Sequence, residues 1–452
     1  MAQNNTLNLK LGISYKDILH TILPIFIALS IPTISFVVNN IFISKIGQAE
    51  MGTGLIAGVY FLLFTAVGYG LNGGLQSILS RRAGEENILG ISKTFFNGLC
   101  INVFISIAAI VFTYFITPII MDYFLNNTLG KSNDTMEFLR IRMISLPFLL
   151  CIQLFSSFFI SVNKAFYIVV ITITTTVLNI FLDYSLIFGH FGFNAFGFNG
   201  AAYASVFADI IGFIVALGIL FIFKFYKKYF LFKHTILNTT ICKSIFKQSA
   251  PLIFQNFISI GSWLFFFFLV NNYGTEQSAI SSIMRNMFAI STTLVWASGS
   301  ATNTMVSNLI GQNKPDLVWP LIKRILLVCV GFTILMCIAM NVAPHLFIDL
   351  FDNNGLLYNN TLPVFRVISF VIIFMSVSCI FLNASTGTGN PNFNLKVECF
   401  AVICYLIYSS LAAKYFHLSL TYLWLNEFVY WSAILIIIYP FMLSNKWRNK
   451  QI

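Results

Sequence analysis

The sequence predicts an all-α polytopic membrane protein of twelve transmembrane helices, arranged in two parallel six-helix repeats (6+6) around a central cavity. Three observations support this fold class: the composition, the lengths of the apolar runs and an internal repeat. Of the 452 residues, 58% are hydrophobic and only 9% are charged. Soluble globular domains carry about 25% charged residues, so we expect the chain to lie in a membrane and to contact its lipids.

Twelve apolar runs are long enough to cross a bilayer as helices, which requires about 20 residues each. In chain order these runs cover 18–43, 54–80, 93–118, 137–161, 166–189, 200–223, 249–271, 278–309, 321–343, 362–384, 394–413 and 421–443. The eight cysteines fall mostly within the runs and lack metal-type spacing, so we interpret them as packing residues. The polar N-terminus does not resemble a signal peptide, and we expect none to be removed.

The two halves of the chain repeat one another. A proline and two glycines of the first half recur in the second half, all three displaced by the same distance along the chain. The three pairs are Pro24 and Pro251, Gly47 and Gly274, and Gly84 and Gly311. Each repeat holds six predicted helices, and because six is even, both copies enter the membrane in the same sense. Parallel repeats with a central cavity between their bundles are typical of carriers.

The basic residues indicate which side of the membrane each loop faces. The net charge is +11, and most Lys and Arg residues lie at the two ends of the chain and in every second loop. By the positive-inside rule, this bias places both termini in the cytoplasm. We therefore interpret the Lys-rich stretch 225–248 as a cytoplasmic linker rather than a nucleic-acid site. The predicted domains are an N-terminal bundle, 1–224, this linker, and a C-terminal bundle, 249–452.

Five segments form short motifs at or near the ends of predicted helices. They are IFISKIG (41–47), QSILSRRAGEEN (76–87), LNIFLDYSLIFG (178–189), GFNGAAYAS (197–205) and SNLIGQNKPD (307–316). With these motifs nearly the whole chain resembles the multidrug and toxic compound extrusion (MATE) family. The resemblance implies a secondary active antiporter of the bacterial inner membrane, exporting cationic or amphipathic organic solutes or drugs by alternating access in exchange for H⁺ or Na⁺.

Two other functions compete with this interpretation. A lipid-linked saccharide flippase of the same superfamily is the alternative, but such carriers usually offer a cationic cavity, and few arginines lie within the predicted helices. A membrane-embedded enzyme is not expected, because the five His residues are scattered and no nucleophile motif is visible. We expect a monomer that acts on a small-molecule substrate without a cofactor and without a nucleic-acid partner.

The predicted helix 166–189 carries a polar stripe. Asn179 and Asp183 are four residues apart and share one helix face. Thr176, three residues before Asn179, lies on the same face. A carboxylate inside a bilayer costs roughly 2.5 to 3.5 kcal/mol on insertion scales, and it is generally retained for a partner or a function. Burial favours the protonated acid, so Asp183 could load and release a proton, or with Asn179 it could bind Na⁺. The resemblance implies a cation site at this pair; the structural alternative is an aspartate satisfied by neighbouring hydroxyl and amide groups.

Two further helices supply candidate members of the site. Asn39 and Asn40 stand in the first helix, where the family commonly has an acidic residue. Asparagine cannot carry a proton, which argues against a two-carboxylate relay. In the sixth helix, Ser205 and Asp209 form another pair four residues apart, and Asp209 either replaces the missing acid or pairs elsewhere in the bundle. We include all four residues in the predicted cation site.

The second half offers a weaker case for such a site. Its predicted helices contain Arg285, Arg366, Glu398 and Glu427. We expect ion pairs among them, because a lone buried arginine requires a counter-charge. The predicted helix 249–271 also lacks the acidic residue found in some sodium-coupled relatives.

Overall fold

The computed structural model describes residues 9–44, 48–119, 131–233, 235–349, 357–448 and 450. Within the helices, it describes the backbone alone at residues 34, 36, 37, 40, 41, 43, 44, 48–53, 55 and 131–134. Across the described ranges the secondary structure is helical, with no strand.

The helices of the first half follow the predicted order. They are α1 (Tyr15–Ser44), α2 (Gln48–Gly84), α3 (Ile88–Phe115), α5 (Lys131–Met143), α6 (Leu146–Ser161), α7 (Phe166–Phe188), α8 (Phe198–Ile222) and the short α9 (Phe225–Lys228). Gly189 ends α7 in the left-handed conformation, with φ of 75°, which a residue without a Cβ adopts at little cost.

The second half has more breaks. Its helices are α10 (Thr239–Asn271), α11 (Thr275–Ser291), α12 (Thr293–Gly311), η1 (Pro315–Leu317), α13 (Val318–Val342), α14 (His345–Ile348), α15 (Tyr358–Gly387), α16 (Pro391–Ser410), the π-helical η2 (Leu411–Tyr415), α17 (Leu420–Leu423) and α18 (Asn426–Leu443).

Each of the twelve predicted spans falls on one of these helices or on a pair of them. Ten helices in the described part of the chain are long and apolar enough to cross a membrane, and α5 with α6, bent by 45°, makes an eleventh. The remaining predicted span, 278–309, is divided into α11 and α12 at Thr292. Thr292 and Thr293 both donate to carbonyls of the preceding turn, a pattern that tends to bend helices.

The breaks in the helices differ between the two halves. The correspondence of Pro24 with Pro251 matches each residue of the first repeat to one of the second. By this correspondence α2 matches 275–311, the stretch that α11 and α12 share. The helix is therefore continuous in the first repeat and broken in the second. The same correspondence matches 131–161 of α5 and α6 to 358–388, which is almost wholly the unbroken α15. Pro147, in the first turn of α6, explains the break in the first half, because proline lacks an amide hydrogen and disfavours a helical residue before it.

The helices group into two compact units. One comprises Ile27–Ser249, and the other comprises Met1–Phe26 together with Ala250–Ile452. The first part of α1 therefore groups with the second half of the sequence, and the first turns of α10 group with the first half. The predicted bundle boundaries at 224 and 249 follow the sequence repeat instead.

Hydrogen bonds explain why the start of α1 and the start of α10 each group with the other half of the sequence. Asn308 of α12 accepts from the Leu11 amide at 2.9 Å and donates to the Leu9 carbonyl at 3.0 Å. In the other unit, Asn97 of α3 accepts from the Asn238 amide at 2.9 Å. The segment before the first helix of each repeat is thus tied to helices that belong mainly to the other repeat.

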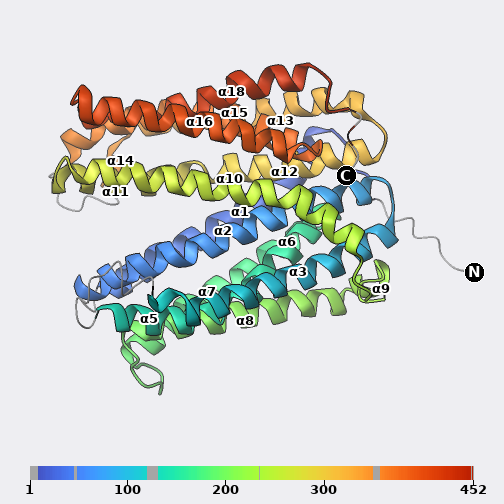
Figure 1. The fold of residues 1–452 in the computed structure, drawn as a ribbon, viewed down its shortest axis with the longest axis horizontal. Helices are drawn as coiled ribbons and strands as arrows, with labels where there is room; N and C mark the ends of the chain where they lie inside the picture. Colours follow the sequence, from blue (N-terminus) through green and yellow to red (C-terminus); the bar gives the residue numbers. More distant parts are fainter. Residues whose placement is uncertain are drawn as a thin grey trace, which may run out of the picture. The chain divides into compact units, whose positions relative to one another are not determined.

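Each unit has a dense interior. In the unit of Ile27–Ser249, α7 packs on α8, and α2 packs on α3 and α6; Figure 1 shows α7 and α8 running side by side. Buried Asn72 and Asn102 join α2 to α3 through side-chain hydrogen bonds of 3.0 and 3.3 Å. In the other unit, α15 packs on α12, α13 and α18, and α16 packs on α18.

Candidate functional site

Asp183 lies in the last turns of α7 and is completely buried. Its Oδ2 atom accepts a hydrogen bond from the Asn39 amide of α1 at 3.1 Å. Its other oxygen, Oδ1, is buried and has no hydrogen-bond partner among the residues that the structure describes. Buried polar atoms are nearly always hydrogen-bonded, so an unpartnered carboxylate oxygen marks a place where a proton or a cation can bind.

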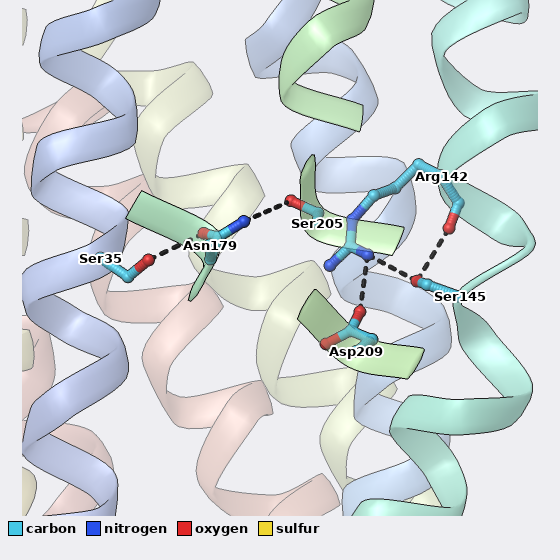
Figure 2. Close-up of polar contacts among 6 residues, drawn as sticks. All are labelled: Ser35, Arg142, Ser145, Asn179, Ser205 and Asp209. Atoms are coloured by element: carbon cyan, nitrogen blue, oxygen red, sulfur yellow. Dashed lines mark hydrogen bonds and ion pairs between the residues drawn. The ribbon is translucent and has the colours of Figure 1, made fainter. Parts of the chain in front are cut away.

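Asn179, one turn earlier on α7, links three helices. Its Oδ1 atom accepts from the Ser35 hydroxyl of α1 at 2.9 Å, and its amide donates to the Ser205 hydroxyl of α8 at 3.3 Å. Figure 2 shows the three side chains in one row. The structure therefore brings Asp183 and Asn179 together with three groups from neighbouring helices, as the spacing of the polar stripe predicts.

Thr176 and Asn40 are the remaining predicted members on α7 and α1. Thr176 is buried on α7, but no hydrogen bond joins its hydroxyl to the described members of the cluster. The side chain of Asn40 lies outside the described residues. Ser35 is four residues before Asn39, and this spacing predicts a polar face of α1 that carries both side chains.

Asp209 has a partner of its own. The guanidinium of Arg142, at the end of α5, donates to Asp209 Oδ2 at 2.8 Å. It also donates to the Ser145 hydroxyl, and Figure 2 shows Arg142 between these two groups. Asp209 is thus paired with another residue of the bundle, which is the second of the two possibilities given for it.

The comparisons with known proteins identify the family. The MatE family model matches the chain twice, over residues 24–185 and again over 251–412. The chain belongs to the MatE family. The two matched stretches begin at the paired prolines, Pro24 and Pro251, and confirm the internal repeat. Members of this family are multi-pass membrane transporters rather than enzymes.

Curated relatives of the MatE protein carry the name "Probable multidrug resistance protein NorM". The one from Thermotoga maritima is 25% identical over 63% of this chain and 61% of its own length. The one from Synechocystis is 23% identical over 74% of both chains. The chain thus spans less than two thirds of the Thermotoga relative. Neither relative favours the flippase alternative.

Solved structures confirm the twelve-helix fold of the MatE protein. A MOP superfamily transporter from Pyrococcus furiosus and an outward-facing multidrug resistance MATE family transporter each match with a TM-score of 0.88. Both are 15% identical, with all of this chain and all of each matched chain covered.

The MatE protein has a second buried carboxylate cluster, which the sequence reasoning missed. Glu398 of α16 accepts hydrogen bonds from Gln255 at 3.1 Å and from the Ser259 and Tyr430 hydroxyls. Gln255 and Ser259 are four residues apart on α10, and this spacing could have indicated a polar face. The prediction of ion pairs for Glu398 is wrong, since its partners are all neutral.

The other three residues for which ion pairs were predicted, Arg285, Arg366 and Glu427, form none within the described part of the chain either. Arg285 lies over the Phe267 ring, with its guanidinium carbon 5.6 Å from the centroid. Glu427 is buried beside Tyr405 and Trp431. A cation over an aromatic face gains about 0.5 to 1 kcal/mol at exposed sites and more when desolvated, which provides a neutral alternative to the predicted pairing.

The Asp183 cluster is suited to a small hard cation. It offers carboxylate, amide and hydroxyl oxygens, which suit H⁺ or Na⁺ better than soft transition metals. Among the described residues there is no group of three His, Cys, Asp or Glu side chains that could hold a metal ion.

Proposed function

We propose that this MatE protein is a secondary active antiporter that exports organic, cationic or amphipathic solutes in exchange for H⁺ or Na⁺. The names of its curated relatives support multidrug export. In this proposal, the protein works by alternating access as a monomer in the bacterial inner membrane, with both termini in the cytoplasm.

One observation carries the proposal: Asp183 is completely buried, and one of its oxygens has no partner in the described part of the chain. A structural aspartate would be expected to have both oxygens satisfied. A carboxylate that is half satisfied in a low-dielectric interior is costly when empty, so binding a proton or a sodium ion would relieve that cost. Cation binding and release at Asp183 would then be coupled to the conformational change that moves the solute.

Asp183 is the cation-binding carboxylate in this proposal, and the neighbouring groups hold it in place. Asn39 binds the occupied oxygen, while Asn179 ties the helices around the site through Ser35 and Ser205. Either coupling ion fits this set of oxygens, and the choice between them is a matter for experiment.

The test is uptake of a fluorescent cationic dye into inverted membrane vesicles that contain wild type or Asp183→Asn. A proton gradient and a sodium gradient are imposed separately. We expect one of them to drive uptake by the wild type and neither to drive uptake by the mutant. The matched control is Asp316→Asn, which removes an exposed carboxylate paired with Arg448 and should transport normally. Gradient-driven uptake by Asp183→Asn at the wild-type rate would refute the role of Asp183.

A further inference from the structure

Arg142 is held on three sides at the break between α5 and α6. It pairs with Asp209 of α8 at 2.8 Å and donates to the Ser145 hydroxyl. Its guanidinium carbon also lies 4.1 Å from the centroid of the Phe61 ring. Ser145 in turn donates to the Arg142 carbonyl at 2.9 Å. Two hydrogen bonds therefore join these residues across the break between α5 and α6.

This arginine is a permanent cation near the Asp183 cluster. Asp209 is one turn from Ser205 on α8, and Ser205 is bonded to Asn179. The Arg142 guanidinium also lies within electrostatic range of the Asp183 carboxylate. Among described side chains, Asp183 is the one carboxylate of this unit that is completely buried, and it has an unpartnered oxygen.

The charged groups around the cluster are few. Among the described side chains of α1 beyond residue 26, α6 and α7, Asp183 is the one charged group, and α8 adds Asp209. On α5, Arg140 and Glu137 are exposed, and Arg140 lies over the Tyr114 ring instead. Among these described side chains, the charged groups that are not exposed are therefore Arg142, Asp183 and Asp209, and Asp209 already pairs with Arg142.

We propose that Asp209 is a positioning residue that holds Arg142 away from Asp183, so that Asp183 stays open for the coupling cation. This inference rests on the proposed function of Asp183. Without the Asp209 charge, Arg142 is a partly buried cation that lacks a counter-ion, a costly state. The open oxygen of Asp183 is the alternative partner, and a guanidinium bound there would compete with H⁺ or Na⁺. The pair thus sets the concentration of cation that the site requires.

The experiment measures dye transport against the concentration of the driving cation in three variants. Asp209→Asn should raise the concentration for half-maximal transport at least tenfold, because Arg142 then competes for Asp183. The double variant, Arg142→Gln with Asp209→Asn, removes the competitor and should return to within about threefold of wild type. Arg142→Gln alone should need no more cation than wild type, because an extra carboxylate favours cation binding.

A merely structural pair would behave differently. Each variant would lose the tie between α5 and α8, the maximal rate would fall in all three, and the double variant would be no better than Asp209→Asn. That result would overturn the inference. If Asp209→Asn does not fold, the double variant is compared with Arg142→Gln alone. Lower transport by the double variant would also overturn the inference. The control pair, Arg82→Gln with Glu85→Gln, breaks a half-exposed ion pair of the same unit and should have no effect.

The two proposals can fail separately. If Asp183→Asn transports normally, the proposed function of Asp183 is wrong, and the role of Asp209 has no basis. If Asp183→Asn is inactive but Asp209→Asn has the wild-type cation dependence, only the inference about Asp209 is wrong.

Discussion

Asp183 and Glu398 are buried carboxylates on equivalent helices of the two repeats, yet their surroundings differ. The displacement that carries Pro24 onto Pro251 carries α7 onto α16 and η2, and it carries Asp183 onto position 410, twelve residues after Glu398. Twelve residues correspond to about 18 Å of helix. Asp183 is near the end of its helix and Glu398 is near the start of its own, so the duplication did not copy the site.

The difference between them lies in their hydrogen bonds. Glu398 accepts from three neutral donors that reach both of its oxygens. Among the described side chains, Asp183 has one donor, Asn39, and its other oxygen has no partner. A fully satisfied buried network stabilises a fold, whereas an incomplete one leaves a position for a ligand. This contrast supports the role proposed for Asp183 in transport, and it predicts a structural role for Glu398.

The largest expected contrast comes from the two amide substitutions. Asp183→Asn should abolish cation-driven dye transport, because the amide cannot take up a proton or neutralise a cation. Glu398→Gln should retain most of the transport and its cation dependence, since a glutamine oxygen still accepts from the neighbouring donors. Vesicle transport under an imposed gradient measures both. Equal loss in the two variants would mean that both carboxylates take part in coupling.

Removal of the Glu398 side chain should have the largest effect on stability. Glu398→Ala leaves the Gln255, Ser259 and Tyr430 donors without their acceptor in a buried position. Each unsatisfied group costs about 1 to 3 kcal/mol, so the purified transporter should unfold at a clearly lower temperature than wild type. Thermal unfolding in detergent checks this expectation. An unchanged unfolding temperature would show that the cluster contributes little to the fold.

A smaller effect is expected when one donor is removed from each carboxylate. Asn39→Ala should shift the cation concentration for half-maximal transport by about tenfold or more, since a hydrogen bond to a charged group contributes about 1.5 to 3 kcal/mol. Tyr430→Phe should instead lower the unfolding temperature and leave the cation dependence unchanged. Both quantities are measured for both variants. The assignment of roles fails if Tyr430→Phe changes the cation dependence as much as Asn39→Ala does.

The sequence was sufficient to predict the fold and the shared helix face of Asn179 and Asp183. Apolar runs report membrane spans directly, because lipid imposes both length and hydrophobicity on a helix. A single carboxylate in such a run stands out for the same reason, and the spacing of Asn179 and Asp183 placed both on one face. These signals are local, and they remain valid wherever the helix packs.

Contacts between helices were harder to predict. The pairing of Asp209 with Arg142 joins residues 67 positions apart, and no periodicity within either helix reports it. The Glu398 cluster was missed for a similar reason, because its donors come from α10 and α18. The expected ion pairs there assumed that opposite charges meet, whereas the fold provided neutral donors for Glu398 and an aromatic ring for Arg285.

The smallest effect we predict compares two serines at equivalent positions of the repeat, Ser35 and Ser262. Ser35 donates to Asn179 at 2.9 Å, whereas Ser262 donates to the Ser259 carbonyl of its own helix at 2.7 Å. A neutral hydrogen bond contributes about 1 kcal/mol, so Ser35→Ala should raise the cation concentration for half-maximal transport about two- to fivefold. Ser262→Ala should not change it, because that hydroxyl bonds within one helix and does not position a cation-binding group. Matched titrations of the two variants check the difference, and a shift of equal size in both would mean that cation affinity depends on general helix packing rather than on the cluster around Asp183.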